Sequence, residues 1–123
     1  MTGKIRLDNT LIALAESVCR WSVVLLDKAP LTEDQREDIV AIHIASQGFV
    51  EYASAQISLI TTEVDKDTKK RIRHQLRNYL NVIIGFSRLI VKELPDNLLM
   101  DMVTVRKIHD TGEMLMVQVD AIQ

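Results

Sequence analysis

A histidine surrounded by cationic side chains is the feature of this chain most suited to chemistry. The histidine is His74, and the cations are Lys69, Lys70, Arg71, Arg73 and Arg77. Such a cluster could stabilise a phosphorylated imidazole and attract an acidic partner. Basic runs are more often solvated helix faces without a further role. The cluster alone therefore assigns no function to His74.

The remaining histidines and the single cysteine predict no site. His43 and His109 stand in mostly apolar stretches without a companion at metal-ligand spacing, so we expect satisfied or surface histidines. Cys19 falls on an apolar stripe and is expected to pack as a small hydrophobe, since no Cys–His–acid arrangement accompanies it. No glycine-rich phosphate-binding loop is found. We expect neither a metal nor a cofactor.

The composition predicts an all-helical protein of one domain. The 123 residues fit one domain, and 47% of them are apolar while only 4% are aromatic. The core must therefore be aliphatic. The chain has only two prolines and four glycines, the residues that most often interrupt helices and strands, which favours a few long elements.

The net charge and the cysteine content limit the kinds of binding partner and the cellular compartment that we expect for this protein. The net charge of −2 argues against general nucleic-acid binding. One cysteine cannot form a disulfide within the chain, so a reducing, cytoplasmic environment is expected. The segment Met1–Arg6 lacks the apolar core of a signal peptide, and no charge-free apolar run approaches the length of a membrane span.

Apolar periodicity predicts four helices, over about 8–29, 33–60, 66–94 and 97–123. Their matched lengths and short connections are typical of an antiparallel four-helix bundle. The residues predicted to face inward are Leu11, Leu14, Ala15, Val18, Cys19, Trp21, Leu25 and Leu26, then Ile39, Ile42, Ala45, Phe49, Tyr52, Ala53, Gln56 and either Ile57 or Ile60, then Ile72, Leu76, Leu80, Ile83, Phe86, Leu94 and either Leu89 or Ile90, and finally Leu98, Met102, Val105, Ile108, Gly112, Leu115, Val119 and Ile122.

Helix boundaries have recognisable signals. Thr32 with Gln35 forms a capping box, and acidic residues follow it near the positive end of the helix dipole. Either Thr62 or Asp65 caps the third helix, and Asp96 caps the fourth. Pro30 and Pro95 are expected to act as helix stops.

The two halves of the chain resemble each other, which suggests an internal duplication. A shift of 65 residues pairs Trp21 with Phe86, and it also pairs the two prolines. A shift of 64 pairs Gly48 with Gly112 and Ile44 with Ile108. On this interpretation residues 1–62 form a degenerate hairpin and residues 63–123 form a second hairpin that carries His74.

The segment from His74 to Ser87, HQLRNYLNVIIGFS, closely resembles the phosphoacceptor helix of the dimerisation domain of sensor histidine kinases. That family's pattern is His, an acid, Leu, Arg, Thr or Asn, Pro, Leu, Asn, any residue, Ile, Ile, Gly, Phe or Tyr, and Ser. The segment from Ile108 to Leu115, with Thr111-Gly112, is similar to the family's second helix. The resemblance spans about 71–122 and implies that His74 is the phosphoacceptor.

This chain departs from the family pattern at two positions. Gln75 replaces the acid that serves as the base for autophosphorylation, and Tyr79 replaces a proline that kinks the helix. Asn78 retains the amide or hydroxyl position that can orient a hydrolytic water. In the first hairpin the position matching His74 is Asn9, which cannot carry a phosphoryl group.

The resemblance implies a protein of two-component signalling, either a phosphotransfer protein or a receiver-docking one. His74 would accept the phosphoryl group, with Asn78 and Arg77 orienting it, and Gln75 would exclude autokinase activity. No ATP-binding domain follows in the sequence, so we expect at most a phosphotransferase or a receiver phosphatase. The alternatives are a non-catalytic module that binds a receiver or sensor kinase, and a regulatory fragment of a larger sensor. Both a monomeric pseudo-dimer and a homodimer remain open.

Overall fold

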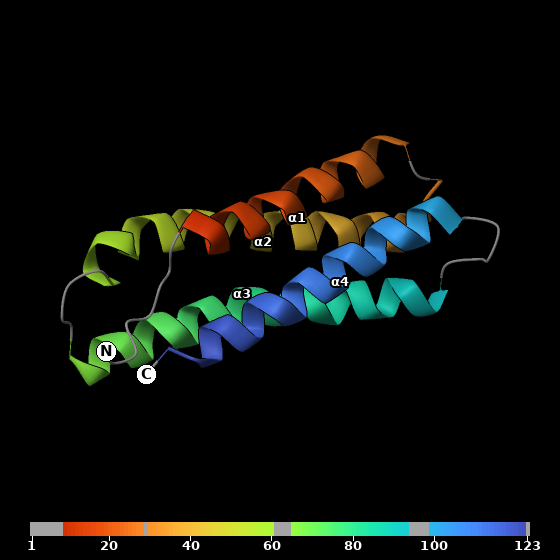
Figure 1. Ribbon diagram of the computed structural model, residues 1–123. Helices are drawn as coiled ribbons and strands as arrows, with labels where there is room; N and C mark the ends of the chain where they lie inside the picture. Colours follow the sequence, from red (N-terminus) through yellow and green to blue (C-terminus); the bar gives the residue numbers. More distant parts are fainter. Residues whose placement is uncertain (1–8, 29, 61–64, 94–98, 123) are drawn as a thin grey trace.

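The computed structural model describes residues 9–28, 30–60, 65–93 and 99–122, and for 57–60 and 99–100 it describes only the helical backbone. These residues form four helices: α1 (Asn9–Lys28), α2 (Glu33–Ile60), α3 (Lys66–Glu93) and α4 (Leu99–Asp120). The prediction of an all-helical four-helix bundle is confirmed. Figure 1 shows the four helices running side by side, with α1 and α2 in one pair and α3 and α4 in the other.

The helices follow an up-down-up-down path in which each one packs on its neighbours in the chain. α1 contacts α2, α2 contacts α3, and α3 contacts α4, while a less extensive contact between α1 and α4 closes the ring. The start of α1 and the end of α4 lie at the same end of the bundle as the end of α2 and the start of α3 (Figure 1). We call α1–α2 the first hairpin and α3–α4 the second hairpin.

Side chains bond to backbone groups at the starts of α2 and α3 and near the end of α1. The capping box at α2 is confirmed, because Thr32 Oγ1 accepts from the Gln35 amide at 3.1 Å and Gln35 Oε1 accepts from the Thr32 amide at 3.0 Å. Arg36 donates to the Leu26 carbonyl near the end of α1. Of the two candidate caps of α3, Asp65 makes the bond, accepting from the Thr68 amide at 2.7 Å.

The core is aliphatic, as predicted, with Phe49 the largest of its fully buried side chains. Ile90 is buried and Leu89 is 48% exposed, which settles that alternative. The inward predictions for Tyr52 and Gln56 hold only in part, because both residues are half-buried. Several predictions lie outside the described residues or side chains. They are the inward positions Ile57, Ile60, Leu94 and Leu98, the candidate cap Thr62, the stop Pro95 and the cap Asp96.

Three serines occupy buried positions that the sequence analysis did not predict. Ser22, Ser46 and Ser87 are fully buried, whereas Cys19 and Phe86, which were predicted to face inward, are only half-buried. Each serine hydroxyl donates to a carbonyl of its own helix, three residues earlier, at 2.7, 2.8 and 3.1 Å respectively. A hydroxyl satisfied in this way can be buried without an unpaired polar group.

The structure supports the equivalence of α1 and α3 but corrects the one proposed for α2 and α4. At the 65-residue shift Leu11 matches Leu76 and Ser22 matches Ser87, and all four are buried. At the 64-residue shift, however, Ile44 is 62% exposed and Ile108 is fully buried. The pairing of Ile44 with Ile108, and with it that of the two glycines, is therefore wrong.

A shift of 66 residues restores the agreement in burial between α2 and α4. It pairs buried residues with buried residues: Ile39 with Val105, Ile42 with Ile108, Ser46 with Gly112, Phe49 with Leu115 and Ala53 with Val119. The same shift pairs His43 with His109, and both are half-buried. Sequence periodicity could not separate these registers, because neighbouring shifts bring similar apolar residues together.

An aromatic contact between α2 and α3 joins the hairpins. The Tyr52 and Tyr79 rings lie 6.4 Å apart between centroids. A Cβ at Gly48 would lie 2.5 Å from Tyr79 Cε1, so the ring occupies the space that only a glycine leaves open. Tyr79 thus packs at the interface of the two hairpins, and α3 continues through it as a helix.

α1 is the one described helix that is long and apolar enough to cross a membrane by length and composition alone. Core helices of soluble proteins and signal sequences near an N-terminus meet the same criterion. In this fold α1 packs against α2 and α4 and buries Leu11, Ala15, Val18, Ser22 and Leu25.

Candidate functional site

His74 lies on the outer face of α3, in its third turn. Ile72 and Leu76, two residues to either side, are buried, whereas His74 is exposed. On a helix a two-residue step turns by about 200°, so neighbours that face the core direct His74 to solvent. An exposed imidazole fixed on a long, packed helix has the accessibility and the defined direction that group transfer requires.

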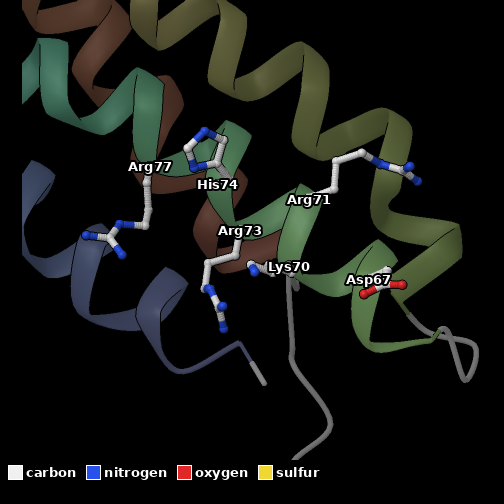
Figure 2. A pocket seen from close by; sticks show the side chains of 6 residues that line it. All are labelled: Asp67, Lys70, Arg71, Arg73, His74 and Arg77. Carbon is white, nitrogen blue, oxygen red and sulfur yellow. The ribbon is translucent and has the colours of Figure 1, made fainter.

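A shallow, open pocket of about 510 Å³ surrounds His74 on the surface of α3. It is lined by Asp67, Lys70, Arg71, Arg73, His74 and Arg77, as Figure 2 shows. Four of these six residues are cations and one is an acid, so the pocket is suited to an anionic group. The helix reinforces this, because α3 carries only two acids, Asp67 near its start and Glu93 at its end.

Two of the pocket's arginines are held by the end of α4. Arg73 donates to the Ile122 carbonyl at 2.6 Å, and Arg77 Nε lies 3.4 Å from Asp120 Oδ1. In Figure 2 both side chains extend toward α4, whereas Arg71 extends toward α2. Arg77, expected to orient a phosphoryl group on His74, is thus engaged with Asp120 in this arrangement.

Asn78 and Gln75 take different places around His74. Asn78 is exposed and stands one helical turn after His74, so the two share a face. Gln75 is half-buried and does not line the pocket. Asn78 thus shares the exposed face of His74, but neither Asn78 nor Gln75 lines the pocket.

Burial raises the pKa of Tyr52, which packs beside Tyr79, and the nearby charge of Arg71 partly opposes that rise. The influence of Arg71 on Tyr52 agrees with its direction toward α2 in Figure 2. Arg71 thus belongs both to the pocket around His74 and to the contact between the two hairpins.

The first hairpin offers a different surface at the matching position. Asn9 is exposed at the start of α1, as His74 is on α3, and the positions that match Lys69 and Arg71 are Lys4 and Arg6, which lie outside the described residues. Its expected partner in sequence, Asp8, lies outside the described residues.

The other residues considered as candidates have defined surroundings. His43 Nδ1 lies 2.9 Å from Ser22 Oγ, so His43 is a satisfied histidine, as predicted. Cys19 is half-buried, donates to Ser46 Oγ at 3.0 Å and reaches a surface pocket, so it does not pack as a purely apolar group. Burial raises the pKa of its thiol, which disfavours the reactive thiolate.

His109 forms a cluster that the sequence analysis did not predict. Its Nδ1 lies 3.1 Å from Glu113 Oε1 and 3.4 Å from Asp110 Oδ1. The neighbours of His109 in this cluster are carboxylates, whereas a second histidine or cysteine at metal-ligand spacing was the expected signal of a metal site. A histidine followed by acids one and four residues later on a helix is the signal that was available.

Comparison with family models, with curated proteins and with solved structures found no match. The functional interpretation therefore depends on the residues and their geometry.

Proposed function

We propose that this protein exchanges a phosphoryl group with receiver domains through His74. The observation that carries the proposal is the exposed His74 imidazole on the cationic face of a long, packed α3. It is supported by the resemblance of the segment that follows His74 to a phosphoacceptor helix.

The reaction follows from the groups present. A neutral imidazole nitrogen of His74 would attack the phosphorus of a receiver's aspartyl phosphate, forming a P–N bond as the P–O bond to the carboxylate breaks. The reverse step returns the group. Lys70 would stabilise negative charge on the transferring oxygens, as would Arg71 once its side chain turns from α2 toward His74, so catalysis is mainly positioning and charge stabilisation.

Arg77 and Asn78 would have different roles in the transfer reaction. Asn78, one turn from His74 on the same face, would donate to a phosphoryl oxygen or orient a water for hydrolysis. Arg77 would have to leave Asp120 to reach the phosphoryl group. Its ion pair is about half-exposed on both sides, so little free energy opposes the exchange of partners.

Autophosphorylation is not part of the proposal. An amide at position 75 cannot accept a proton, and the Gln75 side chain lies outside the pocket of His74. We therefore propose a transfer or phosphatase activity that depends on an external phosphoryl donor.

A second candidate function is a receiver-binding module without chemistry. It is favoured by two observations: the family's base is replaced by Gln75, and Arg77 is occupied by Asp120. Such a module would use the cationic face of α3 to bind an acidic receiver surface and sequester it.

One pair of measurements on a panel of receiver domains separates the two functions. The half-life of each phosphorylated receiver and its affinity for the protein are compared between wild type, His74→Ala and His43→Ala as the matched control. Transfer predicts that His74→Ala abolishes the shortened half-life while binding changes little. A half-life that is the same with and without His74 would favour the binding module.

We further propose that the chain acts as a single-chain bundle, since its four described helices already share one core. Sedimentation at a mass near 14.0 kDa would support this arrangement. A mass of twice that value would instead indicate a homodimer.

A further inference from the structure

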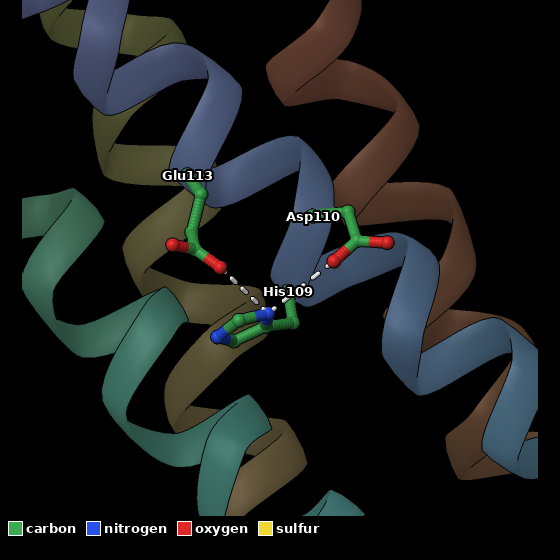
Figure 3. Close-up of side chains that lie close together, drawn as sticks. All are labelled: His109, Asp110 and Glu113. Atoms are coloured by element: carbon green, nitrogen blue, oxygen red, sulfur yellow. Dashed lines mark hydrogen bonds and ion pairs between the residues drawn. The ribbon is translucent and has the colours of Figure 1, made fainter.

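Three ligand-type side chains converge on one point of the outer surface of α4, at His109, Asp110 and Glu113. Figure 3 shows both carboxylates directed at the same ring nitrogen of His109. Nδ1 lies 3.1 Å from Glu113 Oε1 and 3.4 Å from Asp110 Oδ1, and the three donor atoms all lie within 4.8 Å of one another. This cluster plays no part in the function proposed for His74.

We propose that His109, Asp110 and Glu113 bind a divalent transition-metal ion of the zinc type. Zinc bonds to histidine nitrogen and carboxylate oxygen are about 2.0–2.2 Å long, which places tetrahedral ligands roughly 3.3 Å apart. The two separations from Nδ1 match that spacing. Imidazole with carboxylates suits zinc and its neighbours, and water would complete an open, solvent-facing site.

The first hairpin provides an internal comparison for this site. The register that pairs His43 with His109 also pairs Ile44 with Asp110 and Gln47 with Glu113. His43 thus lacks both carboxylates, and its Nδ1 is engaged by Ser22. Both acids of the cluster are present only in the second hairpin, so the site is not a by-product of the shared helical framework.

The surroundings predict modest affinity. His109 Nε2 is buried and has no hydrogen-bond partner among the described residues, so the acceptor that usually orients a metal-bound imidazole is missing. Arg88, Lys92 and Arg106 line the adjoining pocket with His109 and Asp110, and their charge opposes a cation.

The test is a calorimetric titration of the full chain with zinc chloride. The variants are Asp110→Asn, Glu113→Gln and His109→Ala, with His43→Ala and His74→Ala as matched histidine controls. Because Asp110 and Glu113 are mostly exposed, their amide variants should fold normally even if His109→Ala does not.

We expect one zinc ion per chain, a loss of affinity of about tenfold or more for each of the three ligand variants, and no more than a roughly twofold change for the controls. Backbone amide shifts on zinc addition should centre on residues 109–113. Absence of binding at millimolar zinc, or binding that survives Asp110→Asn and Glu113→Gln, would overturn the proposal. So would binding that is lost in His74→Ala.

Discussion

The two hairpins share a buried framework and differ at their surfaces. Leu11 and Ser22 of the first hairpin have buried counterparts in Leu76 and Ser87 of the second. At the exposed positions, the first hairpin has Asn9 where the second has His74. Among the described residues, the matching position thus has an imidazole in the second hairpin and an amide in the first.

This difference extends along the outer faces of the helices. Val23, 41% exposed, and Ile44, 62% exposed, take the places of Arg88 and Asp110. Buried positions of the two hairpins thus have the same character because they face one core, whereas the exposed positions differ in chemical type.

The largest effect is expected in the shared core. Leu11→Ala and Leu76→Ala each remove a side chain that is no more than 1% exposed, and each should lower the free energy of unfolding by about 2–5 kcal/mol. Denaturant titration measures both. A cost confined to Leu76→Ala would mean that the first hairpin does not share a cooperative core with the second.

The contact between the hairpins gives the next largest effect. Gly48→Ala places a Cβ 2.5 Å from the Tyr79 ring, and the overpacking should cost about 1–3 kcal/mol, reduced by roughly 1 kcal/mol through better helix propensity. Gly85→Ala is the control, because nothing lies within 4 Å of its Cβ, and it should stabilise by about 0.5–1 kcal/mol.

Combining Gly48→Ala with Tyr79→Ala identifies the cause. If the ring is the obstacle, adding Gly48→Ala to Tyr79→Ala should cost nothing further. An undiminished cost in that background would contradict the packing assigned to Tyr79.

The buried serines should differ between the hairpins although they occupy equivalent positions. Ser22→Ala removes the hydroxyl 2.9 Å from His43 Nδ1 and should cost about 1–3 kcal/mol, because it leaves that nitrogen without its partner. Ser87→Ala removes only a bond to the carbonyl of Ile84 and should change stability by less than about 0.5 kcal/mol. Equal costs in thermal or chemical unfolding would show that Ser22 does not support His43.

The smallest effects concern two aspartates whose pKa values move in opposite directions. Burial, followed by the charges of Glu93 and Asp34, raises the pKa of Asp38. Protonated Asp38 therefore stabilises the folded state. This contribution to the free energy of unfolding is fully present below the unfolded-state pKa of about 3.9, and it is lost as the pH rises through the folded-state pKa. Asp38→Asn should stabilise the protein by a few tenths of a kcal/mol at pH 7 and have no effect near pH 2.

Asp65 should show the reverse dependence. The hydrogen bond from the Thr68 amide lowers the pKa of Asp65. The contribution of ionised Asp65 to the free energy of unfolding is therefore present above the unfolded-state pKa, and it is lost as the pH falls through the folded-state pKa. Asp65→Asn keeps a capping side chain and should destabilise at pH 7 but not near pH 2. Melting temperatures of both variants across this pH range test the two signs together.

The helices and the Thr32–Gln35 capping box could be predicted from the sequence, because apolar periodicity and capping are local signals. The burial of Ser22 and Ser87 could not, since apolar residues compete for the same stripe and only the packing shows that a hydroxyl can satisfy itself within its helix. The alignment of α2 with α4 was wrong because apolar periodicity does not show that Ile44 is exposed while Ile108 is buried.

Part of the candidate site could likewise be predicted from the sequence, and part could not. The outward direction of His74 follows from its place between Ile72 and Leu76. The engagement of Arg77 by Asp120 could not be foreseen, because the two residues are 43 positions apart in the chain and only the antiparallel packing of α3 and α4 brings them together.

The central claim is that His74 carries a phosphoryl group. The most direct measurement mixes the protein with radiolabelled, phosphorylated receiver domains and looks for acid-labile label on wild type, His74→Ala and His43→Ala. We expect label on wild type and on His43→Ala and none on His74→Ala, because only His74 stands exposed in the cationic pocket. Label that persists in His74→Ala, or that no receiver transfers to the wild type, would contradict the account.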